Sequence, residues 1–156
     1  MKEYNIIKID NQNYYRFDDM VFWRINRRER THAEKLEASK NDFSNAYLAL
    51  SNPNLYVYAA LDSEKLIGWI SIIYMPKIGK FNGLGHLYID ELWVEPTYRN
   101  QGIASNLMKK TDELLDITAS SGIRLYVNTD NPNAKELYQK CGFSENGIAY
   151  FMEKYK

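Results

Sequence analysis

The residues that follow a strand ending at Val94 could bind an anion. A helical stripe of apolar residues starts at Ile103, and no serine, threonine or aspartate stands immediately before it. The first backbone N–H groups of that helix are therefore expected to lack a cap and to carry the positive end of the helix dipole. Gly102 and Ala104 leave room for a ligand, and Arg99 adds a positive charge. These features favour a phosphate site. On these residues alone, a strand–loop–helix connection hydrated at the helix end fits equally well.

Two common phosphate-binding loops are excluded by the sequence. No Gly-Lys-Ser/Thr follows a glycine loop, so the chain has no P-loop. The G-x-G-x-x-G pattern of dinucleotide-binding domains is also absent. A phosphate site before Ile103 would therefore belong to another class.

Four side chains are candidates for proton transfer. Tyr138 has a phenol whose reference pKa is near 10, so it can donate a proton at neutral pH; the alternative is a core tyrosine on an amphipathic helix. Asp90 and Glu91 are adjacent carboxylates in a strand expected to be buried, which is costly unless they hydrogen-bond or act chemically. His86, at the start of the same strand, is a further candidate base, with a loop histidine without function as the alternative.

The position of the two carboxylates depends on the strand that carries them. Alternation sends Asp90 and Glu91 to opposite faces unless a β-bulge intervenes, and it places Asp90 on the side of Leu92 and Val94. We take Asp90 first and Glu91 second as the candidate base. A structural hydrogen-bonding role stays open for each.

The elements that must position these residues follow from periodicity and turn residues. Strands are expected at residues 4–9, 55–61, 66–75, 87–94, 123–127, 143–144 and 148–155. Helices are expected from about residue 13 into the basic cluster at 24–30, and at 42–50, 103–118 and 131–142. Asn131 and Pro132 form a good start for the last helix. The sum is one α/β (α+β) domain over residues 1–156, built around a mixed, mostly antiparallel sheet.

The composition and charge of the chain favour a cytoplasmic protein without a nucleic-acid or membrane partner. The 156 residues carry 20 basic and 20 acidic side chains, so no overall charge favours nucleic acid or a membrane surface as a partner. Cys141 is the only cysteine, and a lone thiol suits a reducing compartment. No leader-like segment is seen, and the longest apolar run is too short to span a bilayer. A cytoplasmic protein without a metal site is expected, and the oligomeric state stays open, a homodimer included.

Two segments resemble motifs of the GNAT acetyltransferases. The run Arg99-Asn100-Gln101-Gly102-Ile103-Ala104 matches the Arg/Gln-x-x-Gly-x-Gly/Ala pyrophosphate loop of that family, and residues 91–98 look like the strand before it. The run from Asn131 to Phe143 is similar to its N-x-x-A-x-x-x-Y-x-x-x-G-F helix. Both motifs stand in the family's order, and the resemblance covers about residues 55–155. It implies the GNAT fold, with a six- to seven-stranded sheet flanked by about four helices.

The resemblance also implies acetyl-CoA as co-substrate and a role for each motif residue. Backbone groups of the strand end would bind the pantetheine arm, amides of the loop would bind the pyrophosphate, and Asn131 would reach the pantetheine. The implied binding residues are Leu92, Trp93, Val94, Arg99, Asn100, Gln101, Gly102, Ile103, Ala104 and Asn131. The Val94 amide would stabilise charge on the thioester oxygen, and Tyr138 would protonate the leaving thiolate, with Asp90 or Glu91 assisting the amine.

The acceptor is implied to be a primary amine of a small molecule or a peptide. Carboxylates near the strand would suit a cationic amine such as a polyamine or an aminoglycoside, and a peptide or lysine amine is also open. Phe22, Trp23 and Tyr47 would form an acceptor wall, with core packing as the alternative. The arginines at 24, 27, 28 and 30 are expected to form a solvated helix face, with an acidic partner or the 3′-phosphate of the coenzyme as the alternatives. The alternative function is a non-catalytic acyl-CoA-binding regulatory module.

Overall fold

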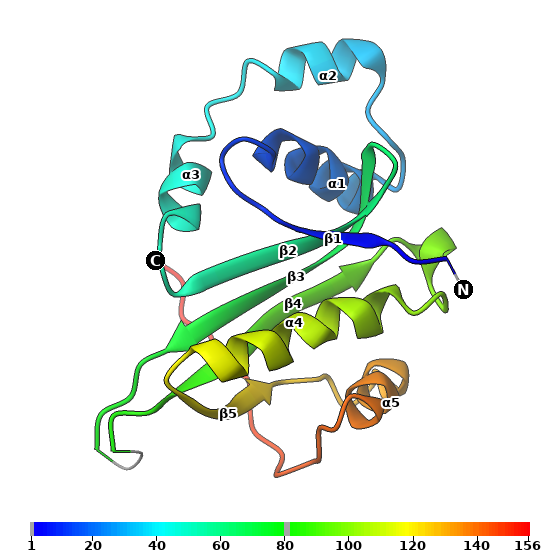
Figure 1. Cartoon of the computed structure of the whole chain (residues 1–156). Coiled ribbons are helices and arrows are strands. Elements are labelled where there is room, and N and C mark those ends of the chain that lie inside the picture. Colours follow the sequence, from blue (N-terminus) through cyan, green and yellow to red (C-terminus); the bar gives the residue numbers. More distant parts are fainter. Residues whose placement is uncertain (1, 80–81) are drawn as a thin grey trace. The chain divides into compact units, whose positions relative to one another are not determined.

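The computed structural model describes residues 2–79 and 82–156, and the chain divides into two compact units, residues 1–126 and 127–156 (Figure 1). The helices and strands of the first unit are β1 (Asn5–Lys8), α1 (Tyr14–Asn26), α2 (His32–Ala38), α3 (Ser44–Leu50), β2 (Leu55–Asp62), β3 (Lys65–Met75), β4 (Gly85–Val94), the 3₁₀ turn η1 (Pro96–Tyr98), α4 (Ile103–Ile117) and β5 (Ser120–Leu125). The second unit contains α5 (Pro132–Lys140).

The sheet of the first unit has five strands in the order β1-β2-β3-β4-β5. The pairs from β1 to β4 are antiparallel, whereas β4 and β5 are parallel and are joined through α4. This arrangement confirms the predicted α/β class with a mixed, mostly antiparallel sheet. A parallel pair needs a crossover connection, and α4 supplies it.

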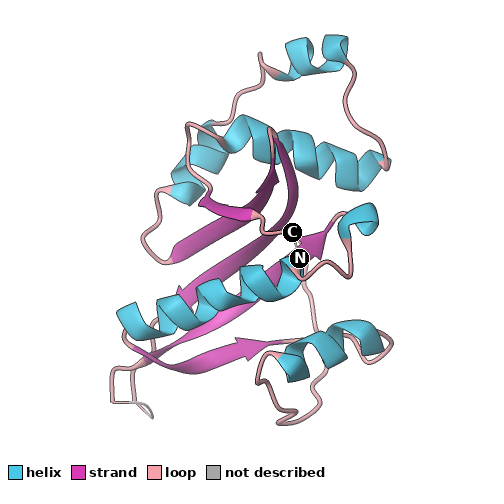
Figure 2. Cartoon of the chain, turned by 45° about the vertical axis from the view of Figure 1, so that its right-hand side comes forward, coloured by secondary structure: helices cyan, strands magenta, loops and turns pink. Residues whose placement is uncertain are grey.

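Helices α1 and α4 cover opposite faces of this sheet (Figures 1 and 2). On the α1 face, Phe17 packs edge-on against the buried Trp69 of β3, with ring centroids 5.2 Å apart. The neighbouring β3 residues Ile70 and Ile72 point to the other face by alternation and are fully buried. There the buried stripe of α4, which is Ile103, Leu107, Met108, Thr111 and Leu114, completes the core.

Several predicted elements differ from the structure. Among residues 2–79 and 82–156 the sheet has five strands rather than six or seven, because residues 143–156 contain no strand. The apolar pattern at 148–155 resembles a strand, but a strand also needs a pairing partner, which this segment does not have within the described residues. β5 ends at Leu125 rather than Val127.

The apolar periodicity of the sequence did not predict helix α2. It buries no residue, so it shows no apolar stripe, and it begins instead with a capping box in which Thr31 and Glu34 exchange hydrogen bonds. When a helix is stabilised by its cap and not by core packing, only the capping residues can indicate it in the sequence.

Candidate active site

The end of β4 has one backbone edge that no strand covers. Pairing between β4 and β5 stops at Ile89 and Leu125, and β5 itself ends there. β4 continues for five more residues, to Val94, and pairs on that stretch with β3 alone. Within the described residues the β4 edge from Asp90 to Val94 is therefore open on the β5 side.

The direction of the backbone groups along this edge follows from one hydrogen bond. The Glu95 N–H donates to Ile67 O of β3 at 2.9 Å. Since successive residues of a strand aim their N–H and C=O groups to alternate sides, those of Val94 and Leu92 point away from β3 and toward the open edge. The intervening Trp93 directs its backbone groups to β3. The edge thus offers a donor and an acceptor at Leu92 and a donor at Val94, whose O accepts from Arg99 Nε, but neither at Trp93.

The loop after β4 leads these groups to the start of α4. Asn100 and Gly102 both adopt left-handed conformations, with φ of 61° and 80°, and α4 begins at Ile103 as predicted. No side chain caps the helix. Within residues 2–79 and 82–156, no hydrogen bond is donated by the backbone N–H groups of Gln101 to Ala104. Uncapped donors at a helix N-terminus attract an anion.

Two loop side chains have structural partners. Arg99 Nε donates to Val94 O at 3.0 Å, so this guanidinium is anchored at the end of β4. Gln101 accepts a hydrogen bond from the Tyr4 hydroxyl at 2.6 Å and donates to Thr97 O at 3.3 Å. These contacts hold the loop between Val94 and Ile103, so the amides of Gly102, Ile103 and Ala104 start from a fixed position.

The two candidate carboxylates sit on a β-bulge. In the pairing of β4 with β3, Ser71 lies opposite Glu91 and Ile72 lies opposite Ile89, so Asp90 is the extra residue. Paired residues of a sheet point to the same face, so Glu91 faces α1 with Ser71. Asp90, one residue after the α4-facing Ile89, faces α1 as well. Two predictions were therefore wrong: Asp90 does not share the side of Leu92 and Val94, and both carboxylates are exposed rather than buried.

The surroundings of Glu91 were not expected from the sequence. Arg24, in the last turn of α1, places Nη1 3.6 Å from Glu91 Oε2. Its guanidinium also lies 5.1 Å from the ring centroid of Trp69, which in turn packs 5.1 Å from Trp93. The α1 face beside the open edge thus combines a carboxylate pair, an arginine and two indoles. Alternation in β3 would have assigned Trp69 to this face, but nothing local pairs Arg24 with Glu91.

His86 lies at the opposite end of β4 from Val94. It is a buried strand residue rather than a loop residue, and its Nε2 is 3.3 Å from Ser121 Oγ. Burial lowers the pKa of His86, and the charges of Arg124 and Lys77 lower it further. The ring is therefore neutral at neutral pH, and its position does not bring it to the carboxylates of the bulge.

The second unit carries the two remaining predicted residues. Asn131 caps α5, accepting a hydrogen bond from the Ala134 N–H at 3.2 Å, and Pro132 follows it as expected. Tyr138 packs its ring 6.1 Å from that of Phe143. Burial raises the pKa of Tyr138 above its usual value near 10, so the phenol keeps its proton at neutral pH.

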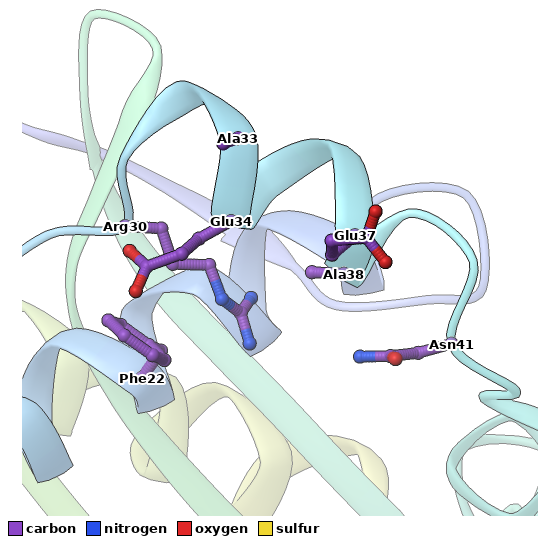
Figure 3. Close-up of a pocket in the computed structure, with 7 residues that line it drawn as sticks. All are labelled: Phe22, Arg30, Ala33, Glu34, Glu37, Ala38 and Asn41. Atoms are coloured by element: carbon purple, nitrogen blue, oxygen red, sulfur yellow. The ribbon is translucent and has the colours of Figure 1, made fainter.

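The basic cluster at the end of α1 is largely paired. Arg30 binds Asp18 and Asp19 at 2.6 and 2.7 Å and has a side chain only 11% exposed. It points beneath α2, beside Phe22, in an open hollow of about 440 Å³ (Figure 3). Arg28 binds Glu34 in α2 at 2.7 Å, so this cluster supports α2 and is not simply a solvated helix face.

The described residues hold no group of three or more His, Cys, Asp or Glu side chains that could bind a metal ion. Nor does any helix in residues 2–79 and 82–156 combine the length and the apolar character needed to cross a membrane.

Comparison with known proteins agrees with this geometry. The model of the acetyltransferase (GNAT) family matches residues 17–143. The chain belongs to the GNAT acetyltransferase family. N-alpha-acetyltransferase RimI of Mycobacterium tuberculosis is 29% identical over 99 residues, which cover 64% of this GNAT chain and 58% of RimI. The chain spans 24% of the uncharacterized protein ML0378 of Mycobacterium leprae and 58% of RimI, which is less than two thirds of either relative.

Solved GNAT-like structures share the fold. One is an aminoglycoside acetyltransferase from an uncultured soil metagenomic sample, in complex with trehalose. Its TM-score is 0.78 at 17% sequence identity, and the match covers 98% of this chain and 97% of the acetyltransferase chain. AAC(6')-Iy, in complex with the bisubstrate analog CoA-S-monomethyl-acetylneamine, has a TM-score of 0.73 at 12% identity, covering 99% and 100%. At these identities the likeness establishes the fold alone.

Proposed function

We propose that this GNAT chain is an acetyl-CoA-dependent N-acetyltransferase that acts on a primary amine. The acceptor is a small cationic amine such as a polyamine or an aminoglycoside, or the amine of a peptide or a lysine. One observation carries the proposal: the open edge of β4 runs directly into the uncapped start of α4. A long ligand with an anionic middle, such as coenzyme A, has complementary groups for both.

The donor set of this site suits the coenzyme. The amides of Gln101 to Ala104 are the proposed diphosphate donors, supported by their lack of internal acceptors. The backbone groups of Leu92, which point to the uncovered edge, are the proposed partners of the pantetheine amides, and the Val94 N–H beside them is left for the thioester. Asn131 and Tyr138 belong to the second unit, so their proposed roles in coenzyme binding and proton transfer rest on the family motif and not on a distance to β4. The co-substrate supplies an acetyl group activated as a thioester.

The proposed chemistry is direct transfer. A neutral amine bonds to the acetyl carbon, the carbon–sulfur bond breaks, the nitrogen loses one proton and the sulfur gains one. The Val94 N–H is the proposed donor to the carbonyl oxygen, where negative charge develops. Tyr138 donates a proton to the sulfur, and its raised pKa keeps that proton available. Asp90 or Glu91 accepts the amine proton, directly or through water.

The proposal is tested by binding and by turnover. The parent should bind CoA at up to millimolar concentration by calorimetry and release free thiol from acetyl-CoA in a screen of amines. Ala104→Asp places a negative charge in the first turn of α4, which favours the helix itself but repels a diphosphate. We expect it to lose CoA binding.

The matched control is Ala33→Asp, the same change at the same position of α2. It should bind CoA like the parent. A parent that fails to bind CoA at millimolar concentration would refute the proposal. CoA binding without thiol release from any amine would instead indicate a regulatory acyl-CoA-binding module.

A further inference from the structure

Arg24 lies on the α1 face of the sheet, where Asp90 and Glu91 are proposed to assist the amine. Its guanidinium lies 5.1 Å from the Trp69 ring centroid, and Trp69 is opposite Trp93, one residue before Val94. Stacking on an aromatic face restrains an arginine without using its N–H donors. The charge therefore stands close to the strand end where the transferred acetyl group is proposed to lie.

The contact of Arg24 with Glu91 leaves the N–H donors of the guanidinium available for a ligand. The two charged groups are 3.6 Å apart, beyond hydrogen-bond distance, and their side chains are 41% and 48% exposed. Arg28 and Arg30, by contrast, bind their carboxylates at 2.6–2.8 Å. No hydrogen bond from the Arg24 guanidinium is found in the part of the chain that the structure describes.

The charges around this position alternate in sign. Asp90 and Glu91 project from the bulge on the α1 face, and Arg24 stands against one of them. A purely cationic acceptor would gain from the carboxylates and lose against the guanidinium. An acceptor with an ammonium and a carboxylate would satisfy both, since a carboxylate matches the paired N–H donors of arginine.

We propose that the acceptor is an amino-carboxylate, an amine that carries its own carboxylate, and that Arg24 is the residue that binds this carboxylate. The inference rests on the proposed acetyltransferase function and narrows its acceptor class. Asp90 and Glu91 then take the amine end, and Arg24 sets specificity without a part in proton transfer.

The experiment compares amines that differ only in the carboxylate. L-lysine and a dipeptide are each assayed beside the corresponding C-terminal amide, with thiol release at saturating acetyl-CoA. We expect kcat/KM to favour the carboxylate form by about tenfold or more, the value of a charge-assisted hydrogen bond pair. In Arg24→Gln this ratio should fall to about one, while Arg24→Lys should keep part of it.

The control variant is Arg28→Gln, an arginine of the same basic cluster whose guanidinium is held by Glu34. It should keep the ratio of the parent. The ratio compares two acceptors within one variant, so a partly unfolded preparation does not change it. Turnover without a carboxylate preference, or a preference that survives in Arg24→Gln, overturns this inference alone. Absence of turnover with every amine overturns the proposed function and this inference together.

Discussion

The alanine variant of Gly68 tests whether the end of β4 positions the reaction. Gly68 is buried in β3 opposite Val94, the residue proposed to donate to the thioester oxygen. A Cβ at this position would lie 2.8 Å from Trp93 O and 3.2 Å from the Val94 Cα. Both neighbours are backbone atoms, so rotation of a side chain cannot relieve the contact.

The size of the effect follows from that distance. Ordinary van der Waals contact begins near 3.4 Å, so β3 and β4 must separate locally by about 0.6 Å. Overpacking of this kind costs about 1–3 kcal/mol of the free energy of unfolding, or roughly 2–12 °C in Tm. A shift of this order at an oxyanion donor is expected to lower kcat by about tenfold or more.

Two other glycines separate the loss of stability from the loss of positioning. Gly85→Ala would place a Cβ 2.4 Å from Met75 O at the far end of β4, so it should lower Tm without moving Val94. Gly122→Ala in β5 meets nothing within 4 Å and should change neither property. Tm is measured by calorimetry and kcat by thiol release. The reasoning is refuted if Gly68→Ala loses no more kcat than Gly85→Ala does.

The other predictions concern the proposed proton donor, an ion pair and a helix cap. Tyr138→Phe should lower kcat by about 10²–10⁴-fold, and because burial raises the pKa of Tyr138, the parent rate should hold on the alkaline side beyond pH 10. Arg30→Met leaves two aspartates of α1 without their partner and should lower the free energy of unfolding by about 1–3 kcal/mol, measured by urea titration. The Arg28 hydrogen bond lowers the pKa of Glu34 from 4.5 to about 2, so the cap of α2 is intact above pH 4.5 and is lost as the pH falls toward 2. The protection factors of the α2 amides against hydrogen exchange should fall over that range in the parent but stay constant in Glu34→Gln.

The uncapped start of α4 could be predicted from the sequence because its signal is local. The absence of a capping side chain before Ile103, together with Gly102 and Ala104, predicts the same uncapped helix start that the structure contains. The cap at Asn131 was predicted for the same reason, since a cap depends on residues within one turn of the chain.

The carboxylate pair could not be placed from the sequence because its geometry depends on another strand. From the sequence alone, the side chains from Ile89 to Leu92 are expected to alternate regularly between the two faces of the sheet. Only the register against Ser71 and Ile72 shows that Asp90 is an extra residue. The contact between Arg24 and Glu91 likewise needs the packing of α1 on the sheet. Sequence reasoning therefore identified the carboxylates as candidates but assigned Asp90 to the wrong face and both of them a wrong burial.

An open edge in the middle of a sheet is costly unless something occupies it. Unpaired N–H and C=O groups invite pairing with another chain, so proteins usually cover or distort such an edge. Here the bulge at Asp90 distorts β4, and Arg99 occupies one acceptor, Val94 O, while the Val94 N–H still points outward. The core beneath is complete, with Ile70, Ile72 and Leu107 fully buried. Since packing on both faces is satisfied, the unmet hydrogen bonds of Leu92 and of the Val94 N–H are a property of the edge alone. The extended ligand proposed above, which carries its own amides, would meet them without unfolding any part of the sheet.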